Sequence, residues 1–131
     1  MFRSRLKMLE MLRKWKEYGY RIAEAASQVL GECEVFAFGS VVEGRATGGS
    51  DVDILVVSRN LPQGDRSHLK ALIEERAGLP PFHPFEIHLV TPQEAEWYRR
   101  HGGTFVRLWP LGESDGGSVD VSRLRDGDKV R

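Results

Sequence analysis

The feature that most constrains this chain is the pair Gly39-Ser40, followed after ten residues by Asp51-Val52-Asp53. The intervening residues include three glycines, and a serine directly precedes the first aspartate. The run Glu34–Phe38 before the motif and the apolar run Ile54–Val57 after it both have the composition of strands. A strand, a glycine-rich turn and a second strand that begins with two carboxylates together favour metal-dependent nucleotide chemistry.

The spacing of the two aspartates predicts how they are oriented. Residues two apart on a strand point to the same face and lie roughly 6.6 Å apart along it. Asp51 and Asp53 should therefore project together, while Val52 and Ile54 point into a core. Two such carboxylates can converge on one Mg²⁺ or share two ions about 3.5–4 Å apart. We expect them to be metal ligands, although a lone pair of this kind is also common on the solvent face of a strand.

The Gly39-Ser40 end offers the features of a phosphate site. A short helix over 40–42 would direct free backbone N–H groups at an anion, and the Ser40 hydroxyl could bond a phosphate oxygen. Gly39 would let the backbone come close to the ligand. Arg45 could neutralise phosphate charge, but a solvated loop arginine is an equally good interpretation.

A third carboxylate is expected at Glu86, within the alternating run Pro84–Val90. The alternation predicts a half-buried strand with Glu86 and His88 on one face and apolar residues on the other. If this strand lies beside the strand of Asp53, Glu86 reaches the same surface. Glu86 could then take a proton from an attacking hydroxyl, with His88 as a possible assistant. Alone, Glu86 would be read as a solvated strand residue.

This order of motifs resembles the DNA polymerase beta-type nucleotidyltransferase superfamily, and within it the minimal MNT-type prokaryotic proteins. The resemblance covers roughly 35–90. It implies that Gly39 and Ser40 bind the triphosphate of ATP. It also implies that Asp51, Asp53 and Glu86 bind Mg²⁺, with two ions expected.

The chain departs from that family pattern at two positions. Many relatives have arginine directly after Gly-Ser, where Val41 stands here. The third carboxylate is more commonly aspartate than glutamate, which leaves the reach and role of Glu86 open.

The resemblance implies transfer of AMP from ATP to a hydroxyl group. Larger relatives carry a helical substrate domain, for which we expect no room here, so the acceptor should be recognised by another polypeptide. MNT-type proteins resemble antitoxins paired with helical HEPN-type ribonuclease toxins, which implies a toxin tyrosine as acceptor. A small-molecule, aminoglycoside-like nucleotidyltransferase completed by a partner subunit and a non-catalytic binding antitoxin remain alternatives.

Rival sites and partners are disfavoured by the sequence. A P-loop would need Lys-Ser/Thr where Arg45-Ala46 stands, and the single cysteine, Cys33, cannot build a zinc cluster. The 19 basic and 19 acidic residues balance, so a nucleic-acid partner is not expected. No long uncharged apolar run is present, so we expect neither a signal peptide nor a membrane span, and a cytoplasmic protein. An oligomer remains possible.

The expected organisation is an α/β fold, a small mixed sheet backed by helices. We predict a minimal nucleotidyltransferase domain over 1–111 and a flexible tail over 112–131. The predicted helices cover 2–30 with a kink or split at Gly19, then from Asp65 or Ser67 to about Ala77, and from Thr91 to His101; the predicted strands cover 34–38, 51–58 and 85–91. The aromatic and basic segment Trp97–His101 is the predicted docking surface for a partner.

Overall fold

The computed structural model describes residues 2–45 and 51–111. The predicted C-terminal tail and the middle of the glycine-rich loop, 46–50, lie outside the described residues. The elements in chain order are α1 (Phe2–Arg13), α2 (Trp15–Leu30), β1 (Glu34–Phe38), β2 (Val52–Val57), α3 (Ser67–Arg76), β3 (Phe85–Val90), α4 (Ala95–His101) and β4 (Phe105–Trp109). None of the described helices is long and apolar enough to cross a membrane.

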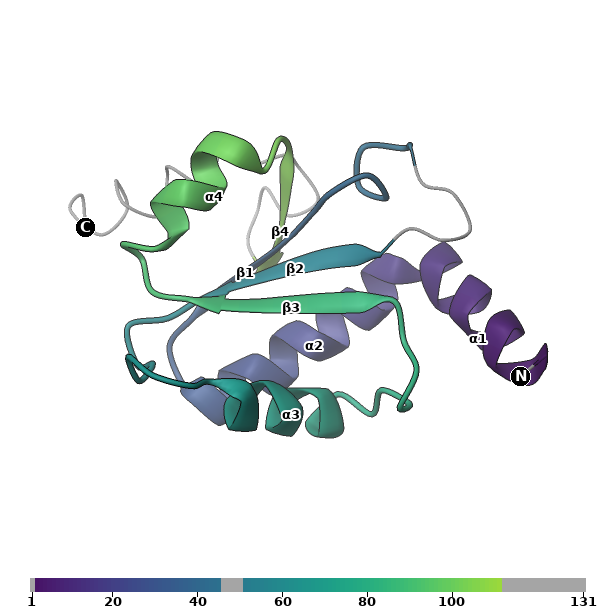
Figure 1. The fold of residues 1–131 in the computed structure, drawn as a ribbon, viewed down its shortest axis with the longest axis horizontal. Coiled ribbons are helices and arrows are strands. Elements are labelled where there is room, and N and C mark those ends of the chain that lie inside the picture. Colours follow the sequence, from purple (N-terminus) through teal and green to yellow (C-terminus); the bar gives the residue numbers. More distant parts are fainter. Residues whose placement is uncertain (1, 46–50, 112–131) are drawn as a thin grey trace.

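The four strands form one mixed sheet in the order β3-β2-β1-β4 (Figure 1). Strands β2 and β3 are parallel, whereas β1 is antiparallel to both β2 and β4. Helices α2 and α3 cover one face of the sheet, and α4 packs on the other. The predicted α/β architecture, a small mixed sheet backed by helices, is confirmed.

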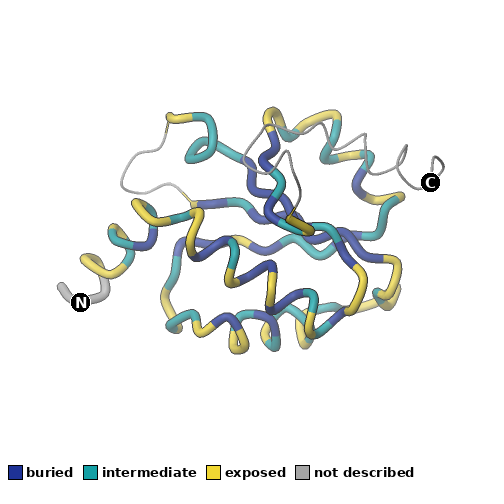
Figure 2. Tube along the Cα trace, turned by 180° about the vertical axis from the view of Figure 1, so that it is seen from behind, coloured by how far each residue is buried: buried dark blue, intermediate teal, exposed yellow. Residues whose placement is uncertain are grey.

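Strand periodicity gives each face of the sheet its own core, because neighbouring residues on a strand point to opposite faces. Figure 2 shows the strands as largely buried, with exposed residues concentrated on the outer sides of the helices. The larger core joins α2 and α3 to residues such as Val35, Ile54 and Ile87, and the smaller core joins α4 to residues such as Phe36 and Leu55. Asp53 lies on the face of the smaller core, because it is two residues before Leu55.

The N-terminal helical segment divides at Lys14, where φ is −105° and ψ is 35°. The predicted kink at Gly19 is therefore wrong. Gly19 is a buried position inside α2, and a Cβ there would stand 2.9 Å from Cδ1 of Leu108 on β4. The absence of a side chain at Gly19 lets α2 pack closely on the sheet.

Strand β4 was not anticipated from the sequence, which predicted only one short helix after the third strand. Phe105–Trp109 pairs antiparallel with β1, with Phe36 opposite Arg107. Phe105 fills the smaller core and Leu108 the larger one, so the short run alternates between the two faces. Its pairing with β1 is a long-range contact that local periodicity does not reveal.

The remaining boundaries agree with the predictions to within a few residues. Helix α3 begins at Ser67, whose backbone N–H donates to Oδ1 of Asp65 over 2.9 Å. Before α4, the N–H of Glu94 donates to Oγ1 of Thr91 over 3.2 Å, and the N–H of Thr91 donates to Oε1 of Glu94 over 2.9 Å. This reciprocal pair is a capping box. Thr91 therefore caps this segment as predicted, although the regular helix begins only at Ala95.

Candidate active site

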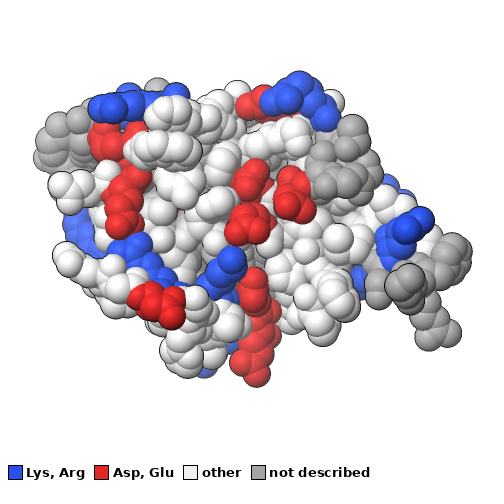
Figure 3. Space-filling view, in the orientation of Figure 1, with Lys and Arg blue, Asp and Glu red and all other residues white. Residues whose placement is uncertain are grey.

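The parallel pairing of β2 and β3 brings two of the predicted carboxylates, Asp53 and Glu86, to one surface. Asp53 stands directly opposite Glu86 in the register, so the two side chains lie side by side on the α4 face of the sheet. Asp51 immediately precedes β2 and is exposed. Figure 3 shows acidic side chains gathered over β2 and β3 on this face. The prediction that the strand of Glu86 lies beside the strand of Asp53 is confirmed.

The Gly-Ser end of the motif meets the Asp-x-Asp end at Gly39 and Asp53. Gly39 follows Phe38, the residue paired with Asp53 across β1 and β2, and has a φ of +101°. A Cβ at Gly39 would stand 2.5 Å from Oδ2 of Asp53. Only glycine combines this backbone conformation with this close approach at low cost. Gly39 thereby leaves open the space beside one oxygen of Asp53.

The segment after Gly39 is a hydrogen-bonded turn, and the predicted short helix over 40–42 is wrong. The N–H of Glu43 donates to the carbonyl of Gly39 over 3.2 Å, and the N–H of Arg45 donates to the carbonyl of Ser40 over 2.8 Å. Gly39 and Gly44 both have positive φ, so the helical conformation cannot extend through either of them. Ser40 lies half-buried in this turn.

Glu43 connects this turn to the loop between α4 and β4. Its carboxylate accepts the backbone N–H of Thr104 over 3.1 Å and also pairs with the guanidinium of Arg45. The Arg45 hydrogen bond, followed by the Thr104 N–H, lowers the pKa of Glu43 below its usual value. In this arrangement Arg45, a predicted nucleotide-binding residue, lies against Glu43.

Glu86 is exposed and forms a salt bridge with Lys70 of α3, with Nζ 3.5 Å from Oε2. Because Glu86 is exposed and Lys70 is only partly buried, the pair adds little stability. The pair matters because of where it lies. Lys70 extends from α3 past the edge strand β3 to the surface that carries Asp53 and Glu86, called here the carboxylate surface. Lys70 was not predicted as a site residue, since only the packing of α3 against the sheet brings it near Glu86.

His88 contacts Asp53 directly, with Nε2 3.1 Å from Oδ1. Tyr98 of α4 lies behind it, with the hydroxyl 3.2 Å from Nδ1 of His88. His88 was predicted on the same face of the strand as Glu86, where it lies, and as a possible assistant to Glu86. Tyr98 was recognised only as part of a docking segment, because its contact with His88 depends on how α4 crosses the sheet.

The donor set of this surface fits a hard divalent cation. Within residues 2–45 and 51–111, no group of three or more His, Cys, Asp or Glu side chains could hold a metal ion. The expected three-carboxylate cluster is thus not assembled in this arrangement. Mg²⁺ commonly takes only one or two protein carboxylates together with substrate phosphates. Asp53 and Glu86 supply such oxygens, and Asp53 has one oxygen facing the space that a Cβ at Gly39 would fill.

Cys33 is buried at the start of β1, and burial raises the pKa of its thiol to about 11. A thiol with this pKa is a poor nucleophile near neutral pH, because the reactive species is the thiolate. The prediction that Cys33 is a packed residue is confirmed, and covalent thiol chemistry has no support here.

Comparison with known proteins decides the family. The sequence model described as "Nucleotidyltransferase domain" matches residues 20–107, more than half of the chain. The chain belongs to this nucleotidyltransferase domain family. The match runs from α2 into β4 and includes every predicted site residue.

One solved structure that is similar to this chain agrees with the family assignment. One crystal structure, described as that of a "putative nucleotidyltransferase", is 30% identical, with a TM-score of 0.52, and the match covers 66% of this chain and 92% of that chain. A second, from Sulfolobus solfataricus and described in the same words, is 21% identical with a TM-score of 0.49, and the match covers 90% of this chain and 91% of that one. The search of curated proteins gave no match.

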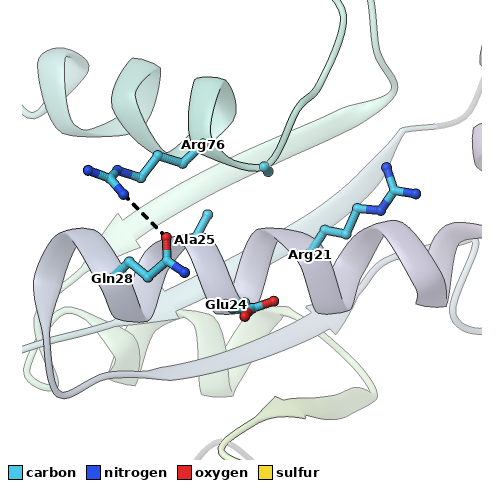
Figure 4. Close-up of a pocket in the computed structure, with 6 residues that line it drawn as sticks. Arg21, Glu24, Ala25, Gln28 and Arg76 are labelled. Atoms are coloured by element: carbon cyan, nitrogen blue, oxygen red, sulfur yellow. Dashed lines mark hydrogen bonds between the residues drawn. The ribbon is translucent and has the colours of Figure 1, made fainter.

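Two surface pockets lie away from Asp51, Asp53 and Glu86. A pocket of about 190 Å³ lies between α2 and α3, and Arg76 donates there to Gln28 over 3.4 Å. Figure 4 shows its lining side chains, with Arg21 directed away from the Arg76–Gln28 pair. A larger pocket of about 560 Å³ lies at the opposite ends of β2 and β3, between Arg59 and the residues before α4. Arg66 in that pocket is already paired with Glu94 over 2.7 Å. Neither pocket is lined by any of the predicted site residues.

Proposed function

We propose that the chain transfers AMP from ATP to a hydroxyl group of a partner protein, using Mg²⁺ at the carboxylate surface. The proposal is based mainly on the position of Asp53, which lies between Gly39 of the Gly-Ser turn and Glu86 of the neighbouring strand. A turn that could bind phosphate and two carboxylates that could bind a metal ion thus lie on one surface, which supports the proposal. Membership of the nucleotidyltransferase family supports the reaction class.

Each side chain has a role that follows from its position. The hydroxyl of Ser40 would donate to a phosphate oxygen beside Gly39. Asp53 and Glu86, joined by Asp51, would hold Mg²⁺. Bound Mg²⁺, with two ions proposed, would lower the pKa of the acceptor hydroxyl and neutralise charge on the triphosphate.

Proton removal and charge balance would fall to the protein side chains at the edge of the sheet. The carboxylate of Glu86 is exposed and would accept the proton of the attacking hydroxyl. Lys70, already beside Glu86, and Arg45, once it leaves Glu43, would offset the negative charge of the triphosphate. The oxygen of the acceptor would form the new bond to the α-phosphorus, and pyrophosphate would leave.

The acceptor is proposed to be a tyrosine of a helical HEPN-type protein. Support comes from the sequence resemblance to MNT-type proteins and from the outer face of α4, defined by Trp97, Arg100 and His101. Trp97 is 59% exposed, and its ring stacks on that of His101 with centroids 4.4 Å apart. Exposed tryptophan and arginine are typical of the residues that dominate protein interfaces. This face adjoins Tyr98, which links α4 to the carboxylate surface.

The test is co-expression with the candidate partner, followed by intact-mass measurement of that partner. We expect the partner to gain the mass of one AMP unit on a tyrosine, in the presence of ATP and Mg²⁺. The control is Asp53→Asn, which removes one charged ligand and should slow the gain of mass roughly 10²–10³-fold. Efficient labelling of an aminoglycoside, with no label on the partner, would favour the small-molecule alternative. Partner binding without any transfer would favour the non-catalytic antitoxin.

A further inference from the structure

Three elements of the fold meet at one carboxylate. Asp53 comes from β2, His88 from β3 and Tyr98 from α4. In the parallel register His88 stands opposite Leu55, two residues beyond Asp53, so its ring reaches diagonally back to the aspartate. The distances are 3.1 Å from Nε2 to Oδ1 of Asp53 and 3.2 Å from Nδ1 to the Tyr98 hydroxyl. Both ring nitrogens of His88 are therefore engaged.

The chemistry of the three groups sets the direction of the hydrogen bonds. An ionised carboxylate only accepts, so Nε2–H of His88 must donate to Asp53. The other nitrogen of a neutral imidazole is then an acceptor, which matches the O–H of Tyr98. Burial raises the pKa of Tyr98, as do the negative charges of Glu94, Asp53 and Glu86, so its hydroxyl keeps its proton. The donor chain runs from Tyr98 to His88 to Asp53.

Aromatic packing holds the imidazole in this orientation. The ring of Phe38 lies 5.6 Å from that of His88 and 5.9 Å from that of Tyr98, and the His88 and Tyr98 rings are 5.4 Å apart. Phe38 belongs to the smaller core and is buried. The His88 ring thus packs between Phe38 of the core and Tyr98 of α4, which restricts its side-chain rotamers.

We propose that His88 is a positioning residue that fixes the Asp53 carboxylate for its ligand, with Tyr98 fixing the tautomer of His88. One oxygen of Asp53 is held by Nε2 of His88, and the other faces Gly39, so the carboxylate is oriented before any substrate binds. Partners that orient a metal-ligating side chain tune both affinity and activity. The catalytic consequence rests on the proposed transfer reaction, whereas the hydrogen-bond chain does not.

The first experiment tests the hydrogen-bond chain from Tyr98 to Asp53 in the absence of metal and substrate. Long-range ¹H–¹⁵N NMR of histidine-labelled protein, recorded at alkaline pH, reports which ring nitrogen of His88 carries the proton. We expect the Nε2–H tautomer alone in the wild type, and a mixture of tautomers in Tyr98→Phe, which keeps the ring but loses the donor. A wild-type protein with the Nδ1–H tautomer, or with a mixture, would overturn the proposal.

The second experiment measures Mn²⁺ affinity by calorimetry. His88→Leu removes the donor and should weaken Mn²⁺ binding about 10–100-fold. His88→Gln places an amide N–H₂ near the position of Nε2 and should restore most of the affinity. His68→Leu, at an exposed histidine on α3, is the matched control and should bind like the wild type. Wild-type affinity in folded His88→Leu, or no rescue by glutamine, would overturn the positioning role. If His88→Leu does not fold, an unaltered affinity in Tyr98→Phe counts against the proposal.

The two experiments distinguish a failure of the positioning role of His88 from a failure of the proposed AMP transfer. A wild type that shows the Nε2–H tautomer and the affinity pattern, but transfers AMP to no partner, would refute the reaction and leave the positioning role standing. A wild type that binds no Mn²⁺ would overturn both the metal assignment and the positioning role.

Discussion

Gly39 and Asp53 are in such close contact that the sheet leaves no room for a side chain at position 39. A Cβ there would stand 2.5 Å from Oδ2 of Asp53, and the residue has a φ of +101°. Gly44, five residues later in the same turn, also has a positive φ but would meet nothing within 4 Å. Substitutions at the two glycines therefore distinguish the effect of backbone strain from the effect of a close contact with Asp53.

The first prediction compares Gly39→Ala with Gly44→Ala. Both substitutions should lower the free energy of unfolding by about 1–2 kcal/mol, because alanine is strained at positive φ. Only Gly39→Ala should also displace the Asp53 carboxylate and weaken Mn²⁺ binding and AMP transfer. Chemical denaturation and calorimetry measure the two effects. Equal loss of Mn²⁺ affinity in both variants would attribute the effect to the turn conformation instead.

The second prediction concerns the three carboxylates. Asp53→Asn should reduce transfer roughly 10²–10³-fold, because a charged ligand is lost where negative phosphate oxygens must be neutralised. Glu86→Gln should reduce transfer as well and should release Lys70, whereas Asp51→Asn should have the smallest effect, since Asp51 is exposed at the end of the loop. Single-turnover rates with the true acceptor check this order. A rate near that of the wild type in Asp53→Asn would contradict the assignment of Asp53 as a metal ligand.

The third prediction concerns the approach of α2 to β4. Gly19→Ala places a methyl group 2.9 Å from Cδ1 of the buried Leu108. Alanine favours the helix by about 1 kcal/mol, but crowding in a packed core costs about 1–3 kcal/mol. We therefore expect a net loss of stability in thermal unfolding. Gly64→Ala, with open space around it, is the control and should be nearly neutral. A higher melting temperature for Gly19→Ala would show that Leu108 moves aside freely.

The fourth prediction concerns pH. Burial raises the pKa of Cys33 from 9.0 to about 11, so the folded state binds the thiol proton more tightly than the unfolded state. The stabilisation is fully present below pH 9 and is lost as the pH rises towards 11, by at most about 2–3 kcal/mol. Cys33→Ala should show a smaller loss of stability over this range in denaturation curves. Identical pH profiles in the two proteins would contradict the burial effect.

Local sequence signals account for the parts of the fold that depend on local physics. Alternation around Glu86 predicted β3 and the face on which Glu86 lies. Thr91 was predicted to cap the segment before α4, and Asp65, one of two predicted caps, accepts the N–H of Ser67 at the start of α3. These features depend on neighbouring residues in the chain, so the sequence reveals them directly.

The parts that the sequence did not reveal depend on tertiary contacts. Strand β4 exists because Phe105–Trp109 pairs with a strand about 70 residues earlier, and Gly19 is needed because Leu108 packs against it. The link from Tyr98 to His88 likewise requires α4 to cross the sheet at one position. The local sequence pattern does not specify these long-range contacts, so the complete set of residues around Asp53 is seen only in the structure.

The final prediction concerns the outer face of α4. The predicted docking segment is divided by the fold: Tyr98 packs towards His88, and Arg99 is half-buried and paired with Glu96 over 2.9 Å, whereas Trp97 and Arg100 are exposed. Trp97→Ala together with Arg100→Glu should therefore weaken partner binding about 10-fold or more, as expected for an aromatic and arginine hot spot. Thermal stability should change little, since neither side chain supports the core.

A matched control for that face is Phe82→Ala. Phe82 is 71% exposed and lies in the loop between α3 and β3, away from α4. It tests whether loss of any exposed aromatic ring weakens binding. Affinity measured by calorimetry should be unchanged in Phe82→Ala and reduced in the α4 double variant. The opposite pattern would move the interface to the edge of the sheet near Phe82, where a bound partner would approach Glu86 from the side of β3.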